Sequence, residues 1–194
     1  MSTDLVAARR PLVLADLVPG LLVRDVLLVI AAAGLTGLFA QISIHLPGTP
    51  VPMTGQTLAV LVSGCALGSK RGAAGMLIYD LLGIIGLPWF AGGGHGYVGV
   101  DFGYLLGFVL AAYLCGFVAE RGADRRVIGA LPAMVLGEVA IYVVGVSWLA
   151  VDLHVGAGKA LSLGFTPFVA GDAVKAAIGA ALLPAAWKLT TRHH

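Results

Sequence analysis

Long apolar runs occupy most of this chain, and they restrict the folds open to it. The six runs are Arg24–Ile44, Met53–Gly68, Gly72–Trp89, Asp101–Glu120, Val127–Val151 and Phe168–Leu189. A membrane-spanning helix needs roughly 20 mostly apolar residues, and the second and third runs are the shortest of the six. Hydrophobic residues make up 59% of the 194-residue chain and charged residues 11%, against about 25% charged residues in soluble domains. The pattern predicts an all-α integral membrane protein with six transmembrane helices.

The basic residues between the runs favour one orientation in the membrane. Ten fall on one side of a six-span arrangement: Arg9, Arg10, Arg24, Lys70, Arg71, Arg121, Arg125, Arg126, Lys188 and Arg192. Lys159 falls on the other side, and Lys175 lies inside a run. Because cytoplasmic loops carry the excess of Lys and Arg, we expect both termini in the cytoplasm.

The chain divides into three parts on this pattern. Residues 1–23 form an N-terminal segment, either an amphipathic interfacial helix or a solvated tail. Residues 24–190 form one membrane domain. Residues 191–194 form a tail in which His193 and His194 look like a tag remnant. The net charge of +2 is too small to suggest a nucleic-acid partner, and the lack of a phosphate-binding loop means that any ATP hydrolysis needs another subunit.

Two charges three residues apart lie inside the last apolar run. Asp172 and Lys175 share a helix face and can partly neutralise each other. A charge within a membrane-spanning helix costs about 2.5–3.5 kcal/mol on insertion scales, so it usually marks a function. We interpret the pair as a polar ligand site reached from outside; the alternative is a structural ion pair between helices. Gly171, directly before Asp172, would let a ligand or another backbone approach closely.

Two outer connections could border such a site. The loop at residues 90–99 contains three consecutive glycines, Gly92, Gly93 and Gly94. Their N–H groups could form an anion-binding nest, and their freedom suits a lid over the site; a flexible connector is the alternative. Trp89 and Phe90, beside the glycines, are either membrane-interface anchors or a stacking surface. Gln56, near the outer end of the second run, is either a ligand contact or a bond between helices.

Two carboxylic acids lie near the middle of other runs. Asp80 in the third run and Glu138 in the fifth could pair through a shared proton, bind a cation or relay protons. An intramembrane enzyme built on these acids and Ser147 would need a Ser–His or metal-ligand pairing within a run, which the sequence lacks.

Neither a metal site nor a cofactor site is predicted. The outer histidines, His45, His95 and His154, do not have the paired spacing that a metal site needs.

Small residues line one side of the first run. The positions are Ala32, Thr36 and Ala40 on one stripe and Ala33 and Gly37 on a neighbouring one. Faces of this kind let helices pack closely. The sequence leaves open whether the face packs internally or meets a partner.

Five motifs follow one another between residues 24 and 190. They are Val51-Pro-Met-Thr-Gly-Gln-Thr-Leu-Ala-Val-Leu, Ala66-Leu-Gly-Ser-Lys-Arg-Gly, Gly83-Ile-Ile-Gly-Leu-Pro-Trp-Phe-Ala-Gly-Gly, Gly103-Tyr-Leu-Leu-Gly-Phe and Pro167-Phe-Val-Ala-Gly-Asp-Ala-Val-Lys. In this order they resemble the BioY family, the biotin-specific substrate-binding (S) subunits of energy-coupling-factor (ECF) transporters. The segment Val100-Asp101-Phe102 departs from the family, which usually carries a longer Gly-Pro-Thr-Gly-Gly-Tyr stretch there, and this departure bears on the geometry of the lid.

The resemblance implies a function and its partners. It implies a six-helix protein of the bacterial plasma membrane that captures biotin from outside, with a transmembrane coupling subunit and two ATPase subunits driving release inward. It implies that the small-residue face of the first helix meets the coupling subunit. It also implies that Gly171, Asp172 and Lys175 contribute to the biotin pocket, and we add Tyr104 from the fourth motif to the candidate ligand contacts.

The chemistry of biotin agrees with these residues. Asp172 can accept a hydrogen bond from a ureido N–H, Lys175 can donate to the ureido carbonyl, and glycine N–H groups at residues 92–94 could hold the tail carboxylate. The alternatives are a solitary biotin transporter and an S subunit for another vitamin or a metal ion.

Overall fold

The structure is a computed structural model, and it describes residues 12–18, 20 and 22–191. Its helices are α1 Leu22–Ala40, α2 Gln56–Leu67, α3 Ser69–Ile84, α4 Phe102–Ala119, α5 Val127–Asp152, α6 Ala157–Gly164 and α7 Val169–Thr191. Short 3₁₀ turns are η1 Leu14–Leu17, η2 Ala91–Gly93, η3 Gly99–Asp101 and η4 Ala123–Arg125. Two short strands, β1 Ser43–Ile44 and β2 Met53–Thr54, pair antiparallel with Ser43 opposite Thr54.

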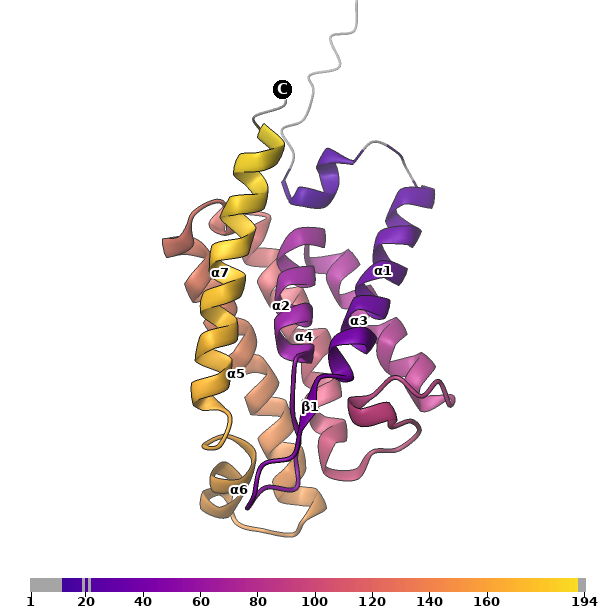
Figure 1. Cartoon of the computed structure of the whole chain (residues 1–194), viewed down its shortest axis with the longest axis vertical. Coiled ribbons are helices and arrows are strands. Elements are labelled where there is room, and N and C mark those ends of the chain that lie inside the picture. The colour runs from indigo at the N-terminus through magenta and orange to yellow at the C-terminus, as the bar shows by residue number, and fades with distance from the viewer. Residues whose placement is uncertain (1–11, 19, 21, 192–194) are drawn as a thin grey trace, which may run out of the picture.

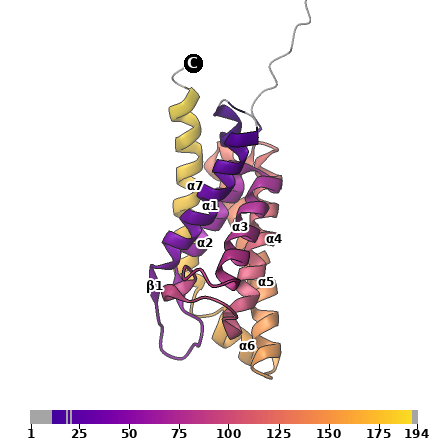
Figure 2. The ribbon, with the colours of Figure 1, turned by 90° about the vertical axis from the view of Figure 1, so that its right-hand side faces the viewer.

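The long helices form a bundle that is mostly aligned with the long axis of the molecule (Figure 1). The first helix begins, and the last one ends, at the same end of this bundle. The β-hairpin and α6 lie toward the opposite end, as the side view also shows (Figure 2). Some residues used in the topology prediction lie outside the described part of the chain. They are Arg9, Arg10 and Arg192, together with His193 and His194 of the C-terminal tail.

Four of the described helices are long and apolar enough to cross a membrane. They cover Leu22–Ala40, Gly99–Ala119, Val127–Asp152 and Val169–Thr190. The protein is therefore a mostly helical, multi-pass membrane protein.

The second and third predicted spans are shorter than the sequence suggested. With 12 and 16 residues, α2 and α3 extend only about 18 and 24 Å, against roughly 30 Å of hydrocarbon. The prediction for α2 started too early because Met53 and Thr54 pair as a strand. The prediction for α3 ended too late because Gly86 adopts a φ of 118° and Pro88 follows two residues later.

Glycines let α2, α3 and α4 meet backbone to backbone. A Cβ at Gly64 would lie 2.7 Å from the carbonyl oxygen of Ala112, and one at Gly72 would lie 2.9 Å from the Cα of Gly64. At the turn between α2 and α3, a Cβ at Gly116 would lie 2.3 Å from the backbone nitrogen of Ser69. Close approach of this kind is how helices associate in lipid, where apolar burial gives little drive.

The small-residue face of α1 packs inside the chain. Its five members, Ala32, Ala33, Thr36, Gly37 and Ala40, are all buried. A Cβ at Gly37 would lie 2.9 Å from the ring of Trp89, and one at Gly75 of α3 would lie 3.1 Å from the Cβ of Ala32. In this structure α3 and Trp89 cover the face, and its contact with a partner subunit stays a prediction. Internal packing, the alternative, is what the residues do.

A charged cluster fastens the N-terminal turn η1 to the bundle. The guanidinium of Arg71 on α3 lies 2.7 Å from Asp16 of η1 and 3.1 Å from Asp25 of α1. Burial by itself would raise the pKa of Asp16, but hydrogen bonds from Arg71 and from the N–H groups of Val13 and Leu12 outweigh it and hold that pKa below its usual value. This part of the N-terminal segment is docked on the bundle rather than solvated.

Candidate functional site

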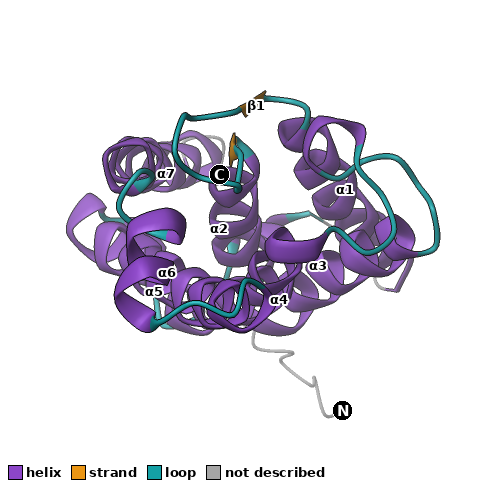
Figure 3. Cartoon of the chain, turned by 90° about the horizontal axis from the view of Figure 1, so that it is seen from below, coloured by secondary structure: helices purple, strands orange, loops and turns teal. Residues whose placement is uncertain are grey.

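A cavity opens between α2, α4, α5 and α7, and the backbone just before α2 and the loop at residues 90–101 contribute to its wall. Seen along the bundle axis, the β-hairpin and this loop cross the end of the bundle near these helices (Figure 3). Five of the predicted ligand contacts line the cavity: Gln56, Phe90, Tyr104, Asp172 and Lys175. Residues far apart in the sequence are thus brought together at one site.

The Asp172–Lys175 pair forms one polar wall of the cavity. The Nζ of Lys175 lies 2.7 Å from Asp172 Oδ1, 2.6 Å from the carbonyl oxygen of Thr54 and 3.0 Å from Thr57 Oγ1. The side chains are 16% and 8% exposed for Lys175 and Asp172. An ammonium group has three hydrogens, so Lys175 is fully satisfied by these three acceptors.

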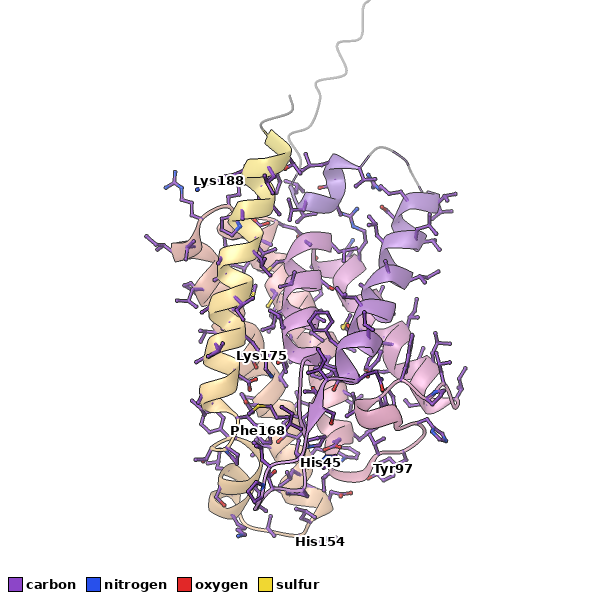
Figure 4. The ribbon with its side chains drawn as sticks, viewed as in Figure 1. His45, Tyr97, His154, Phe168, Lys175 and Lys188 are labelled. Carbon is purple, nitrogen blue, oxygen red and sulfur yellow. The ribbon has the colours of Figure 1, made fainter. Side chains whose placement is uncertain are left out.

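Asp172 also joins three helices. Its Oδ1 accepts from Thr57 of α2 at 3.4 Å as well as from Lys175. Its Oδ2 accepts from the hydroxyl of Tyr142 on α5. The pair is therefore both a link between α2, α5 and α7 and the most polar part of the cavity wall. Figure 4 places Lys175 about midway along the bundle and Phe168 closer to the end that carries His154.

Aromatic rings form much of the remaining wall. Tyr104 and Tyr142 meet edge to face with centroids 6.5 Å apart, and Tyr142 meets Phe165 in the same way at 4.8 Å. The hydroxyl of Tyr104 donates to the carbonyl oxygen of Gly164 at 2.7 Å. Gly145 allows this placement, because a Cβ there would lie 2.4 Å from the Tyr104 ring. Rings fixed in this way suit a flat, largely apolar ligand.

Gln56 lines the cavity while holding Tyr79. Its Nε2 donates to the Tyr79 hydroxyl at 2.7 Å, and that hydroxyl donates to the carbonyl oxygen of Trp89 at 3.2 Å. Trp89 itself lies outside the cavity lining and returns a bond from Nε1 to the Tyr79 carbonyl oxygen at 3.0 Å. Gln56 and Trp89 thus hold the start of the loop against α2 and α3.

The three glycines of the loop do not form the predicted anion nest. The N–H of Gly93 donates to the carbonyl oxygen of Phe90 at 3.0 Å, and that of Gly94 donates to Ala91 at 3.2 Å. These two donors are used inside the η2 turn, and none of Gly92, Gly93 and Gly94 lines the cavity. Phe90 and Ala91, directly before them, do line it. Gly171 is also outside the lining, and it lies against the end of the Met53 side chain, since a Cβ there would lie 2.9 Å from Met53 Cε.

Hydrogen bonds tie the loop to the bundle farther along. The hydroxyl of Tyr97 donates to Asp152 Oδ1 at 2.8 Å, and Trp148 Nε1 donates to the carbonyl oxygen of Gly99 at 3.1 Å. The N–H of Gly96 donates to the carbonyl oxygen of Gly83 at 2.8 Å. The loop is thus a cover attached to α3 and α5, with Phe90 on its inner side.

Comparison with known proteins identifies the fold and the family. The sequence model of the BioY family matches residues 8–192. The chain belongs to the BioY family.

Relatives and a solved structure agree with this assignment. A probable biotin transporter BioY of Pyrococcus horikoshii is 40% identical over 157 residues, which are 79% of this chain and 90% of that protein. The biotin transporter BioY of Rhizobium etli is 37% identical over 166 residues, which are 76% and 88% of the two chains. The crystal structure of the S-component for biotin from an ECF-type ABC transporter is similar in fold, with a TM-score of 0.78 and 22% identity over 86% of this chain and 92% of that chain.

Three cavity residues were missed by the reading of the BioY motifs. Thr57 lies inside the first motif, next to Gln56, and its hydroxyl contacts both members of the ion pair. Tyr142 lies in an apolar run with no neighbouring polar pattern, so only the packing of α5 on α7 reveals it. Asp101 lies in the segment that departs from the family, and it also lines the cavity.

The two remaining intramembrane acids lie outside the cavity lining. Asp80 and Glu138 are buried, and neither carboxylate accepts a hydrogen bond from any described residue. Across the same part of the chain, no group of three or more His, Cys, Asp or Glu side chains is placed to hold a metal ion.

Proposed function

We propose that this chain is the biotin-binding subunit of a vitamin uptake transporter and that biotin binds in the cavity beside Asp172 and Lys175. The observation that carries the proposal is the buried Asp172–Lys175 pair at the wall of an aromatic cavity in a member of the BioY family. Relatives that cover most of the chain are biotin transporters by name. The function is transport rather than catalysis.

The ureido ring of biotin matches this wall. The ring presents two N–H donors and one carbonyl acceptor side by side, and the wall presents a carboxylate and an ammonium group 2.7 Å apart. Asp172 already accepts bonds from Lys175, Thr57 and Tyr142, so ring binding exchanges some of these for bonds to the ligand. Hydrogen bonds to charged groups are worth about 1.5–3 kcal/mol each. Several of these bonds together with ring burial are enough for nanomolar affinity, about −12 kcal/mol.

We further propose that six helical segments cross the bacterial plasma membrane with both termini inside. Lys188 and the end of α7 then lie at the cytoplasmic end and His154 at the outer end (Figure 4). The short helices α2 and α3 would cross together with the non-helical segments at residues 45–55 and 85–101. Such backbone is tolerated at membrane depth where it lines a cavity, and Val51, Pro52, Met53 and Thr54 do line it. The expected partners are the transmembrane coupling subunit and two ATPase subunits of an ECF transporter.

Equilibrium binding of radiolabelled biotin to the purified protein in detergent tests the proposal. We expect saturable binding by the wild type and weaker binding by Lys175→Met. A thermal unfolding transition, measured for both proteins, checks that each is folded. If Lys175 binds the ureido ring, biotin and its methyl ester lose affinity equally in the variant; if it holds the tail carboxylate, only the acid loses affinity. Absence of saturable binding by folded wild-type protein would refute the proposed ligand.

Uptake assays distinguish a solitary transporter from one that needs the module. Biotin uptake is measured in a host that lacks the coupling and ATPase subunits and in the same host supplied with them. Uptake only in the supplied host supports the ECF assembly, and equal uptake in both hosts supports a solitary transporter.

A further inference from the structure

Asp101 is a polar residue of the cavity wall that takes no part in the hydrogen bonds of the Asp172–Lys175 pair. It closes the η3 turn at residues 99–101 and lines the cavity. Its Oδ1 is buried and accepts no hydrogen bond from any described residue. A buried acceptor without a donor costs about 1–3 kcal/mol, so the lack of a donor at Asp101 needs an explanation.

The usual structural role of an acid at this position does not explain Asp101. The residue is the N-cap of α4, where an aspartate side chain normally accepts a bond from the first turn of the helix. Here the side chain makes no capping hydrogen bond, and its own N–H donates to the carbonyl oxygen of Val98 at 3.3 Å. The residue lines the cavity instead, where a ligand can supply the hydrogen-bond donor.

The part of the ligand that meets Asp101 follows from the proposed function, on which this inference rests. With the ureido ring against Asp172 and Lys175, the carboxyl tail would extend along Tyr104 toward Asp101, the other carboxylate of the cavity lining. Two carboxylates in contact with each other repel, which disfavours a negative charge on both. A single proton held between them removes the repulsion and supplies the missing donor.

We propose that Asp101 contacts the tail carboxyl group of the ligand and that the two groups share one proton in the complex. Binding of the ionised ligand to ionised Asp101 then takes up one proton from solvent, and no covalent bond changes. The consequence is a specificity: a neutral carboxylic acid is accepted at this end of the cavity, and a carboxylate without a proton is disfavoured.

Other titratable groups lie in the cavity wall or in the loop that covers it, and the test must separate them from Asp101. They are Tyr97 in the loop, Tyr104 on α4, Tyr142 and Asp152 on α5, and Asp172 and Lys175 on α7. Biotin methyl ester makes the separation, because it keeps the ring and lacks the ionisable tail. Any pH effect from the surrounding groups acts on ester and acid alike.

The experiment compares the dissociation constants of biotin and its methyl ester between about pH 6 and pH 8. The wild type should bind biotin more weakly as the pH rises, by up to about tenfold per pH unit for one proton, while ester binding stays level. In Asp101→Asn the amide can donate to the ionised tail, so biotin affinity should become independent of pH and exceed that of the wild type at the highest pH. Asp80→Asn is the matched control, because this carboxyl is also buried without a partner but lies outside the cavity lining. In this variant we expect biotin affinity to fall with pH as steeply as in the wild type.

The outcomes separate this inference from the proposed function. Saturable biotin binding by the wild type with no pH dependence would overturn the shared proton without any variant being needed. Equal loss of acid and ester binding in Asp101→Asn would show that Asp101 contacts the ring or only supports the fold, and an unchanged slope in that variant would remove it from the ligand. Failure of the wild type to bind either compound at any pH would instead refute biotin as the ligand, and this inference with it.

Discussion

Replacing Asp172 by asparagine separates the two tasks of this residue, since the carboxylate both holds Lys175 and faces the cavity. The substitution keeps the shape of the side chain and removes its charge. Lys175 is then left with neutral acceptors only: the carbonyl oxygen of Thr54, the hydroxyl of Thr57 and the amide oxygen of the new asparagine. Breaking a buried ion pair by removing one partner costs about 3–5 kcal/mol. The lysine is partly exposed to the cavity, so we expect about 3 kcal/mol of lost unfolding free energy.

The loss of ligand affinity has a separate cause. A hydrogen bond from a ureido N–H to a carboxylate is worth about 1.5–3 kcal/mol, which corresponds to roughly 10- to 150-fold in the dissociation constant. Asp172→Asn should therefore bind biotin at least tenfold more weakly at a temperature where it remains folded. The assays are equilibrium binding of radiolabelled biotin and denaturant or thermal unfolding in detergent.

The double variant Asp172→Asn/Lys175→Met decides between stability and recognition. It removes the unpaired charge, so stability should return toward that of the wild type, whereas biotin binding should stay lost. A double-mutant cycle gives the coupling of the pair in each assay. Recovery of binding together with stability would show that the pair is only a structural link, and wild-type affinity in folded Asp172→Asn would remove the carboxylate from the site.

Two further predictions concern α1 and the loop over the cavity. Gly37→Leu should lower stability by at least 1–3 kcal/mol, about the cost of overpacking, because even a Cβ would lie 2.9 Å from the ring of Trp89. Gly34→Leu on the same helix has open space around its Cβ and should leave stability unchanged or raise it by up to about 1 kcal/mol, because leucine is a better helix former than glycine; equal unfolding curves for the two variants would contradict the internal packing of this face. Tyr97→Phe removes the 2.8 Å bond to Asp152, worth about 0.5–1.5 kcal/mol, and should speed biotin dissociation by up to about tenfold in a chase experiment, whereas an unchanged dissociation rate would show that the loop does not limit release.

The sequence by itself determined the membrane character and the family of this protein. Apolar runs of about 20 residues leave few alternatives to membrane helices, and this inference needs no tertiary contact. The Asp172–Lys175 pair could also be predicted, because a spacing of three residues places two side chains on one helix face wherever the helix packs. The order of five motifs then pointed to BioY.

Only the tertiary structure decided what each small or polar side chain contacts. A row of small residues permits close approach by any neighbour, and only the structure shows that α3 and Trp89 cover the α1 face. The sequence of the glycine loop suggested free N–H groups for an anion, but those of Gly93 and Gly94 form hydrogen bonds inside the η2 turn. Thr57 and Tyr142 reach Asp172 across separations of 115 and 30 residues. Helical periodicity describes one helix at a time, and the contacts of this site arise between helices, so the pattern along the chain could not place them.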